Sequence, residues 1–181
     1  AQWAARMGSN PSSFQSPTPQ VPAAQVPNRP VEQVSWNMIQ GFLAATGMRL
    51  PSDAEWEYCC RAGTGTAFNN GSNDDALVGN LAWFGGNAMS QTRPVGLKQA
   101  NPLGFHDMHG NVWEWVSDWY SATYFDESPI VNPTGPAMGT SRVFRGGFYL
   151  NLSASTRSSS RSNGVPDAPV FAIGFRVARN P

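Results

Sequence analysis

Charged residues are scarce in this 181-residue sequence. They make up only 13% of it, and twelve basic side chains balance twelve acidic ones to a net charge of zero. An average soluble domain has about 25% charged residues. Because no basic excess is present to attract phosphates, we expect no nucleic-acid partner. Apolar runs near the roughly 18 residues that a membrane helix needs are also missing, so we expect no membrane span in this chain.

Cysteine and histidine are equally rare. The only cysteines, Cys59 and Cys60, are adjacent in sequence, and neighbouring cysteines seldom form a disulfide because the ring is strained. We therefore interpret them as small buried residues. His106 and His109 are the only histidines, which excludes a site with several histidine ligands. With 40% hydrophobic residues, a chain of this length can still build one compact core.

Two short helices are indicated between residues 35 and 63. Ser35 precedes apolar residues at helical spacing and Gly47 follows them, which predicts a helix capped at both ends. Ser52 and Glu55 have the spacing of a capping box, and Gly63 marks the end of a second helix. Neither helix can bury its apolar side alone, so both must pack on other elements.

The rest of the chain is predicted to form loops and short strands. Residues 8–30 and 63–90 are rich in loop-forming residues, whereas 111–116, 142–145 and 173–178 are strand candidates. The fold class is therefore α+β, with two short helices, a few short strands and long ordered loops. Long loops in a compact domain usually serve function.

Six segments, in order along the chain, resemble the formylglycine-generating-enzyme (sulfatase-modifying factor) family. They are residues 7–12, 28–36, 49–58, 110–115, 145–147 and 174–176. The resemblance implies a variant of the C-type lectin fold with short antiparallel strands. It also implies one domain over 1–181, from which the family's usual N-terminal part is missing.

The same resemblance bears on enzymatic activity. Formylglycine generation needs a cysteine pair shortly after the Gly-Gly, to bind copper and exchange with the substrate thiol. Residues 148–157 contain no cysteine, and Cys59 and Cys60 lie in the predicted second helix instead. We therefore expect no copper and no oxidase activity. The alternatives are such an oxidase and an inactive scaffold or assembly relative.

The C-terminal segment also resembles the variable region of diversity-generating retroelement variable proteins. The fixed points of their template are matched by Gly146-Gly147, Arg157-Ser158, Arg161, Pro166-Asp167 and Ile173–Arg176. The resemblance thus places a variable, ligand-binding region at 145–176. Its candidate ligand-binding residues are Phe148, Tyr149, Leu150, Asn151, Leu152, Ser155, Ser160, Ser162, Asn163, Gly164, Val165, Ala168, Val170, Phe171 and Ala172.

The amino-acid composition of this region agrees with diversification by a retroelement. Residues 146–175 contain no Lys, Glu, Gln, Met or Trp, although the chain has six Met and seven Trp. Adenine-directed mutation of an AAC codon can give Leu, Ser, Gly, Val, Ala and Phe, but none of the five missing types. An ordinary loop of small packing residues is the alternative interpretation.

We expect the region to display a shallow, mostly apolar patch for a macromolecular ligand, either protein or glycan. Tyr149 and Phe171 are the expected anchors, because aromatic residues dominate binding hot spots. Four aliphatic residues would be costly to expose without a partner, namely Leu150, Leu152, Val165 and Val170. We expect an extracellular, cell-surface or phage-borne location, although no signal peptide is visible.

The family resemblance also implies structural calcium. The ligands map onto Asp107, the carbonyls of Gly110 and Val112, and Glu114. Hydrogen bonds could satisfy these groups equally well. An upstream calcium site would use Asn80 and Leu81, but its downstream acidic ligand is not evident.

Three tryptophans alternate with other residues over 113–119. Trp113, Trp115 and Trp119 could form a carbohydrate platform. Alternation of aromatic residues is, however, typical of a strand with one buried face. We therefore expect them to belong to the core.

Overall fold

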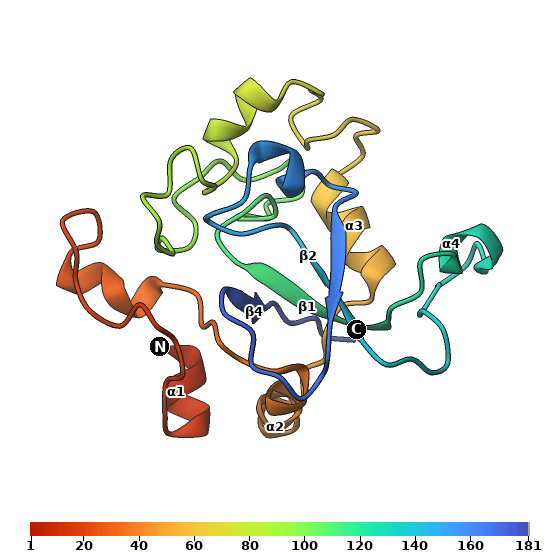
Figure 1. The fold of residues 1–181 in the computed structure, drawn as a ribbon, viewed down its shortest axis with the longest axis horizontal. Helices are drawn as coiled ribbons and strands as arrows, with labels where there is room; N and C mark the ends of the chain where they lie inside the picture. The colour runs from red at the N-terminus through yellow and green to blue at the C-terminus, as the bar shows by residue number, and fades with distance from the viewer. Residues whose placement is uncertain (181) are drawn as a thin grey trace.

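A four-stranded sheet lies at the centre of the molecule. The computed structural model describes residues 1–180. The strands are β1 (Trp113–Trp119), β2 (Arg142–Arg145), β3 (Arg161–Gly164) and β4 (Ile173–Phe175), in the spatial order β3-β2-β1-β4. Helices and long loops surround this sheet on several sides (Figure 1). The α+β class with short elements and long loops is confirmed.

The sheet differs from the expectation in three ways. Strand β1 is antiparallel to β2, but it runs parallel to β4, with Trp113 opposite Ile173. The sheet is therefore mixed: the expected antiparallel pairing is present between β1 and β2 and between β2 and β3, and β4 adds a parallel pair that the sequence did not indicate. The third strand candidate is also shorter than expected, since β4 ends at Phe175. Strand β3 was not expected, because its sequence is polar and its extended form depends on pairing with β2.

Both expected helices are present. Helix α2 (Trp36–Thr46) begins at Ser35, whose hydroxyl accepts from the backbone N–H of Met38. Helix α3 (Asp53–Arg61) begins with the full capping box of Ser52 and Glu55. It ends with Ala62 in the left-handed conformation, one residue before the expected glycine.

Smaller helical turns were not expected from the sequence. They are α1 (Gln2–Met7), η1 (Ala23–Asn28), η2 (Asp75–Asn80), α4 (Tyr124–Glu127) and η3 (Ser153–Thr156). Helix α4 lies in the excursion 120–141 between β1 and β2, which projects from the body on the right of Figure 1. No helix in the described part of the chain is long and apolar enough to cross a membrane.

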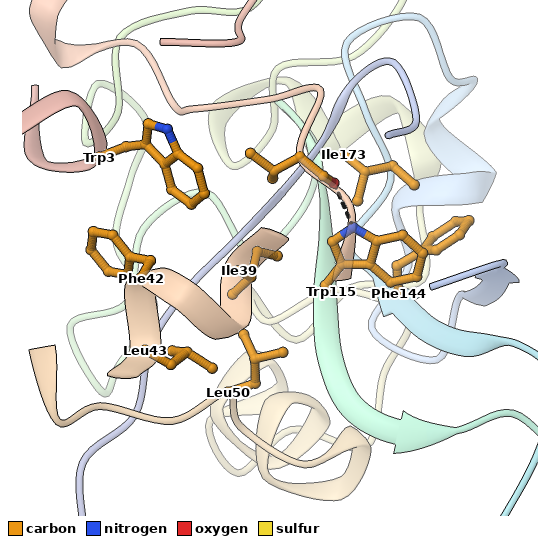
Figure 2. Close-up of a cluster of buried hydrophobic side chains, with 9 residues drawn as sticks. Trp3, Ile39, Phe42, Leu43, Leu50, Trp115, Phe144 and Ile173 are labelled. Carbon is orange, nitrogen blue, oxygen red and sulfur yellow. Dashed lines mark hydrogen bonds between the residues drawn. The ribbon is translucent and has the colours of Figure 1, made fainter. Parts of the chain in front are cut away.

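The main core lies between helix α2 and one face of the sheet (Figure 2). Its buried members are Trp3, Val34, Ile39, Phe42, Leu43, Leu50, Trp115, Phe144 and Ile173. Trp115 is fully buried and its indole N–H donates to the carbonyl of Val34 at 2.9 Å. Trp113 packs edge-on against Phe144 with ring centroids 5.2 Å apart. Core packing therefore explains Trp113 and Trp115, and a platform that includes Trp115 is excluded.

A buried ion-pair network joins α3 to the other side of the sheet. Arg145 is fully buried and contacts the carboxylates of Asp53 and Glu57 on α3. Arg161 on β3 reaches the same Asp53. Because buried charges are tolerated only when they are paired, this network fixes β2 and β3 against α3.

Candidate ligand-binding surface

Residues 145–176 form one continuous stretch along the sheet. They leave β2, pass through η3, return as edge strand β3 and then loop back to β4 beside β1 (Figure 1). The stretch thus begins and ends inside the sheet, and the loops between its strands lie at the surface.

The glycines of this stretch allow close backbone contacts. Gly147 has φ +76°, and a Cβ there would come within 2.9 Å of the carbonyl oxygen of Ser155. A Cβ on Gly174 would lie 2.3 Å from the carbonyl oxygen of Val31. Both positions therefore require glycine for steric reasons.

The fixed polar residues tie the stretch to distant elements. Arg157 pairs with Asp75 of η2 at 3.1 Å, and Arg161 pairs with Asp53 at 2.7 Å. The backbone N–H of Ser158, a buried residue, donates to Ala67 at 2.8 Å.

A second fixed point lies in the loop after β3. The side chain of Asn37, in the first turn of α2, donates to the carboxylate of Asp167. Its backbone N–H donates to the carbonyl of Pro166 at 3.1 Å. Helix α2 therefore anchors this loop through Pro166 and Asp167.

Most of the expected ligand-binding positions are accessible. Leu152 is 79% exposed, Val165 58%, Phe171 49% and Leu150 46%. Asn163 and Ala168 are also exposed. The half-buried positions are Phe148, Asn151, Ser155, Ser160, Ser162, Gly164 and Val170.

Two expected positions are buried, and the expectation that they contact a ligand is wrong for this structure. Tyr149 is 2% exposed and Ala172 is 1% exposed, and together with Ala88 they form a small core. Phe14, from the N-terminal loop, packs edge-on against Tyr149 at 5.5 Å. Burial also raises the pKa of Tyr149 to about 12. Tyr149 is thus a support for the surface and not an anchor on it.

Two further positions have structural roles. Asn151 accepts the backbone N–H of Phe148 at 3.0 Å with its side chain, and its carbonyl accepts from Gly85 at 2.8 Å. Val170 packs against the main core. Their side chains are therefore only partly available to a partner.

The exposed apolar residues lie at three places along the stretch, and Val165 stands in the loop after β3 that α2 anchors. Phe171 packs edge-on against Phe148 at 5.5 Å, next to the buried Tyr149. Leu150 and Leu152 precede η3, which contacts η2. Because these side chains are apolar and uncharged, the surface suits contact with another macromolecule better than chemistry on a small molecule.

The residues of the implied calcium site line one cavity of about 750 Å³. Asp107 accepts the backbone N–H of Gly96 with Oδ2 at 2.7 Å, while its Oδ1 is buried and has no partner among residues 1–180. Burial raises the pKa of Asp107 above its ordinary value. The carbonyls of Gly110 and Val112 accept no hydrogen bond within the described residues. A carboxylate oxygen and carbonyls without donors are the ligands that Ca²⁺ prefers, so these groups fit the ion.

Glu114 is different, because its charge is already compensated. Arg176 donates to Oε1 of Glu114 at 2.6 Å, and the indole of Trp56 donates to Oε2 at 2.6 Å. At the upstream position, the backbone carbonyl of Asn80 accepts from Gln99. The ammonium of Lys98 donates to the neighbouring carbonyl of Gly79. A positive side chain thus lies beside that position, which does not favour a second calcium ion.

The two cysteines lie on α3, outside residues 145–176. Cys60 is buried, with Sγ 3.8 Å from Nε2 of His109. Burial raises the pKa of the Cys60 thiol to about 12 and lowers the pKa of His109 to about 4. Both groups are therefore neutral near pH 7, and the pair lacks the thiolate that nucleophilic chemistry requires. Within the described residues, no three His, Cys, Asp or Glu side chains come together to hold a metal.

Comparisons with known proteins agree with this architecture. A family model described as the sulfatase-modifying factor enzyme 1-like domain matches residues 1–181. A formylglycine-generating enzyme from Streptomyces coelicolor is 39% identical over 170 residues, which cover 85% of this chain and 54% of the relative. The chain therefore spans about half the length of the first curated relatives that it matches.

Two solved structures share the fold over 99% of this chain. Treponema denticola variable protein 1 has a TM-score of 0.88 at 29% identity, and the match covers 80% of that chain. PvdO from Pseudomonas aeruginosa has a TM-score of 0.75 at 27% identity, with 75% of that chain covered. Because the family model spans the whole chain and the fold agrees with these neighbours, the chain belongs to the formylglycine-generating-enzyme, or sulfatase-modifying factor, family.

Proposed function

We propose that this domain is a non-catalytic binding protein whose ligand surface is formed by the exposed residues of 145–176. One observation carries the proposal. The residues that match fixed points of the variable-region template make internal contacts, as Gly147, Arg161 and Gly174 do. Most residues at its variable positions are exposed or half-buried. A surface that changes between copies needs this separation, because substitutions there must leave the fold intact.

The fold neighbour supports the same proposal. Treponema denticola variable protein 1 is a diversity-generating retroelement variable protein, and this chain is similar to it over nearly its whole length. We propose that Leu150, Leu152, Val165 and Phe171 are the principal contacts to a macromolecular ligand. Their apolar character favours a protein surface with complementary apolar side chains.

The proposal that the domain is not catalytic rests on the positions of its two cysteines. The two cysteines of the chain lie on α3, and Cys60 is buried with a raised pKa. The reaction that the family resemblance implies needs a thiol pair after the Gly-Gly. Gly147 is followed there by Phe148, Tyr149 and Leu150.

Flanking DNA tests the diversification. We expect a near-repeat of the coding sequence for residues 145–176, with adenines at the differing positions, and a reverse-transcriptase gene close to it. If neither lies beside the parent gene, the surface is an undiversified scaffold.

A binding selection tests the surface in the protein itself. Leu150, Leu152, Val165 and Phe171 are randomised together, and the displayed library is selected against unrelated purified proteins. We expect folded binders against several targets, whereas a matched library at Gly147, Arg161 and Gly174 should give few folded members. Equal recovery of folded members from both libraries would contradict the proposal.

For catalysis, the protein is incubated with copper and a cysteine peptide, and mass spectrometry should find no aldehyde product.

A further inference from the structure

A cationic cluster lies outside the variable region, on residues 83–98. The guanidinium carbon of Arg93 lies 4.6 Å from the ring centroid of Trp83, and the ammonium of Lys98 lies 3.9 Å from the same ring. Both are cation–π distances, so each cation packs on the same indole, and the ammonium of Lys98 also donates to the carbonyl of Gly79.

Arg93 is held in place but has no anionic partner. Its backbone N–H donates to Asn111 Oδ1 at 2.9 Å, and Asn111 Nδ2 donates back to its carbonyl at 3.0 Å. Its side chain, by contrast, has no hydrogen-bond acceptor or salt bridge among residues 1–180, and its Nε is buried. Arg157, Arg161 and Arg176 each pair with a carboxylate. The guanidinium of arginine presents a rigid fork of N–H donors that matches the geometry of a carboxylate or phosphate, and in Arg93 this fork has no acceptor among residues 1–180.

The electrostatics of the cluster point in the same direction. Partial burial lowers the pKa of both Arg93 and Lys98, and the charge of Arg93 lowers the pKa of Lys98 further. Asp107 is the acid that acts on Lys98, and its effect is smaller than that of burial. A bound anion would relieve the repulsion between the two cations, and the low polarity near the indole would strengthen its attraction.

We propose that Arg93 and Lys98, supported by Trp83, form a binding site for an oxyanion, either a carboxylate or a phosphoryl group. Trp83 packs with Phe148 against the small core of Ala88, Tyr149 and Ala172. The site therefore adjoins the proposed ligand surface, and its residues lie outside 145–176. It gives the domain a constant charged contact beside a surface that varies, a role that rests on the proposed function. The anion site itself stands on the contacts of Arg93, Lys98 and Trp83.

Anion titration followed by NMR tests the site directly. The indole N–H of Trp83 and the side-chain Nε–Hε of Arg93 are monitored during addition of sodium acetate or sodium phosphate, with sodium chloride holding the ionic strength constant. We expect saturable shifts of both signals. Tighter binding of acetate would assign the site to a carboxylate, and tighter binding of phosphate would assign it to a phosphoryl group. Shifts that are linear, or the same with sodium chloride alone, would overturn the proposal.

Variants separate this site from the variable surface. Arg93→Gln should weaken anion binding by at least about tenfold, because the variant loses the charge-assisted hydrogen bonds of the guanidinium. Arg93→Lys, which keeps the charge but loses the fork, should weaken it less. Arg179→Gln, at an exposed arginine, is the matched control and should leave binding unchanged.

A Leu152→Asn, Phe171→Asn double variant should keep full anion affinity. Loss of acetate or phosphate binding in that variant would overturn the separation of the anion site from the variable surface, whereas failure of the binding selection would overturn the proposed function and leave the anion site standing. Anion binding that survives in Arg93→Gln would overturn the anion site alone. Circular dichroism establishes that each variant is folded.

Discussion

Arg161 on edge strand β3 forms an ion pair with Asp53 on helix α3, with Nη2 and Oδ2 2.7 Å apart. Asp53 is almost fully buried, and its other oxygen is held by Arg145. Strand β3, which carries the candidate positions Ser162, Asn163 and Gly164, is thus held by an ion pair to a carboxylate inside the molecule. The outward side chains of β3 are therefore not needed to hold the strand in place.

Replacement of Arg161 should therefore destabilise the fold more than replacement of its neighbours. Arg161→Ala leaves the buried Asp53 with one cation instead of two, and we expect a loss of about 2–4 kcal/mol in the free energy of unfolding. Ser162→Ala, at the next position on β3, should change it by less than about 0.5 kcal/mol. Urea denaturation measures both values. Similar losses for the two variants would mean that the ion pair does not anchor the strand.

Tyr149 and Phe171 should behave differently although both are aromatic residues of the same region. Tyr149→Ala removes a buried ring that packs against Phe14, and we expect a cost of about 3 kcal/mol. Phe171 is half exposed, and Phe171→Ala should cost less than about 1.5 kcal/mol. Thermal and urea unfolding of both variants measures the difference. A small loss in the free energy of unfolding for Tyr149→Ala would mean that its side chain lies at the surface and not in the core.

The elements that sequence predicted well are those fixed by local contacts. The cap of helix α3 needs only Ser52 and Glu55, three residues apart, so its start could be read directly. Strand β3 could not be read, because the sequence from Arg161 to Gly164 is polar and extends only by pairing with β2. The parallel pairing of β4 with β1 likewise depends on residues about sixty positions apart.

The candidate surface shows the same limit. Its fixed points could be located from residue types, since Gly147 and Gly174 have no room for a side chain. The burial of Tyr149 could not, because Phe14 covers it from the far end of the chain. Arg93 was also missed, since an unpaired arginine is visible only once its surroundings are known.

The two adjacent cysteines should differ in reactivity. Burial raises the pKa of Cys60 to about 12, so at pH 8 only about one molecule in ten thousand carries that thiolate. Cys59 is half-buried, and burial raises its pKa less. A thiol reagent at pH 8 should therefore label at most one cysteine in the native protein and both in urea, and peptide mapping should place the native label on Cys59.

The sign of the pH dependence follows from the same shift. The unfolded chain releases the Cys60 proton near pH 9, whereas the folded chain keeps it until about pH 12. The free energy of unfolding is therefore unaffected by this thiol below about pH 9, and it falls as the pH rises from 9 toward 12. Cys60→Ser should reduce the loss of stability between pH 8.5 and 10. An unchanged alkaline profile in this variant would show that the thiol is not protected by burial.

Calcium at residues 107–114 should raise the melting temperature, because Oδ1 of Asp107 and two carbonyls lack partners that the ion would supply. A calcium concentration one hundred times the dissociation constant stabilises the native state by about 2.7 kcal/mol, which corresponds to a shift of roughly 5–10 °C at this chain length. EDTA should remove that shift in the wild type and have no effect on Asp107→Asn. Asp126→Asn, at an exposed acid of α4, should keep the full response. Equal melting temperatures for the wild type with calcium and with EDTA would contradict a calcium site at Asp107.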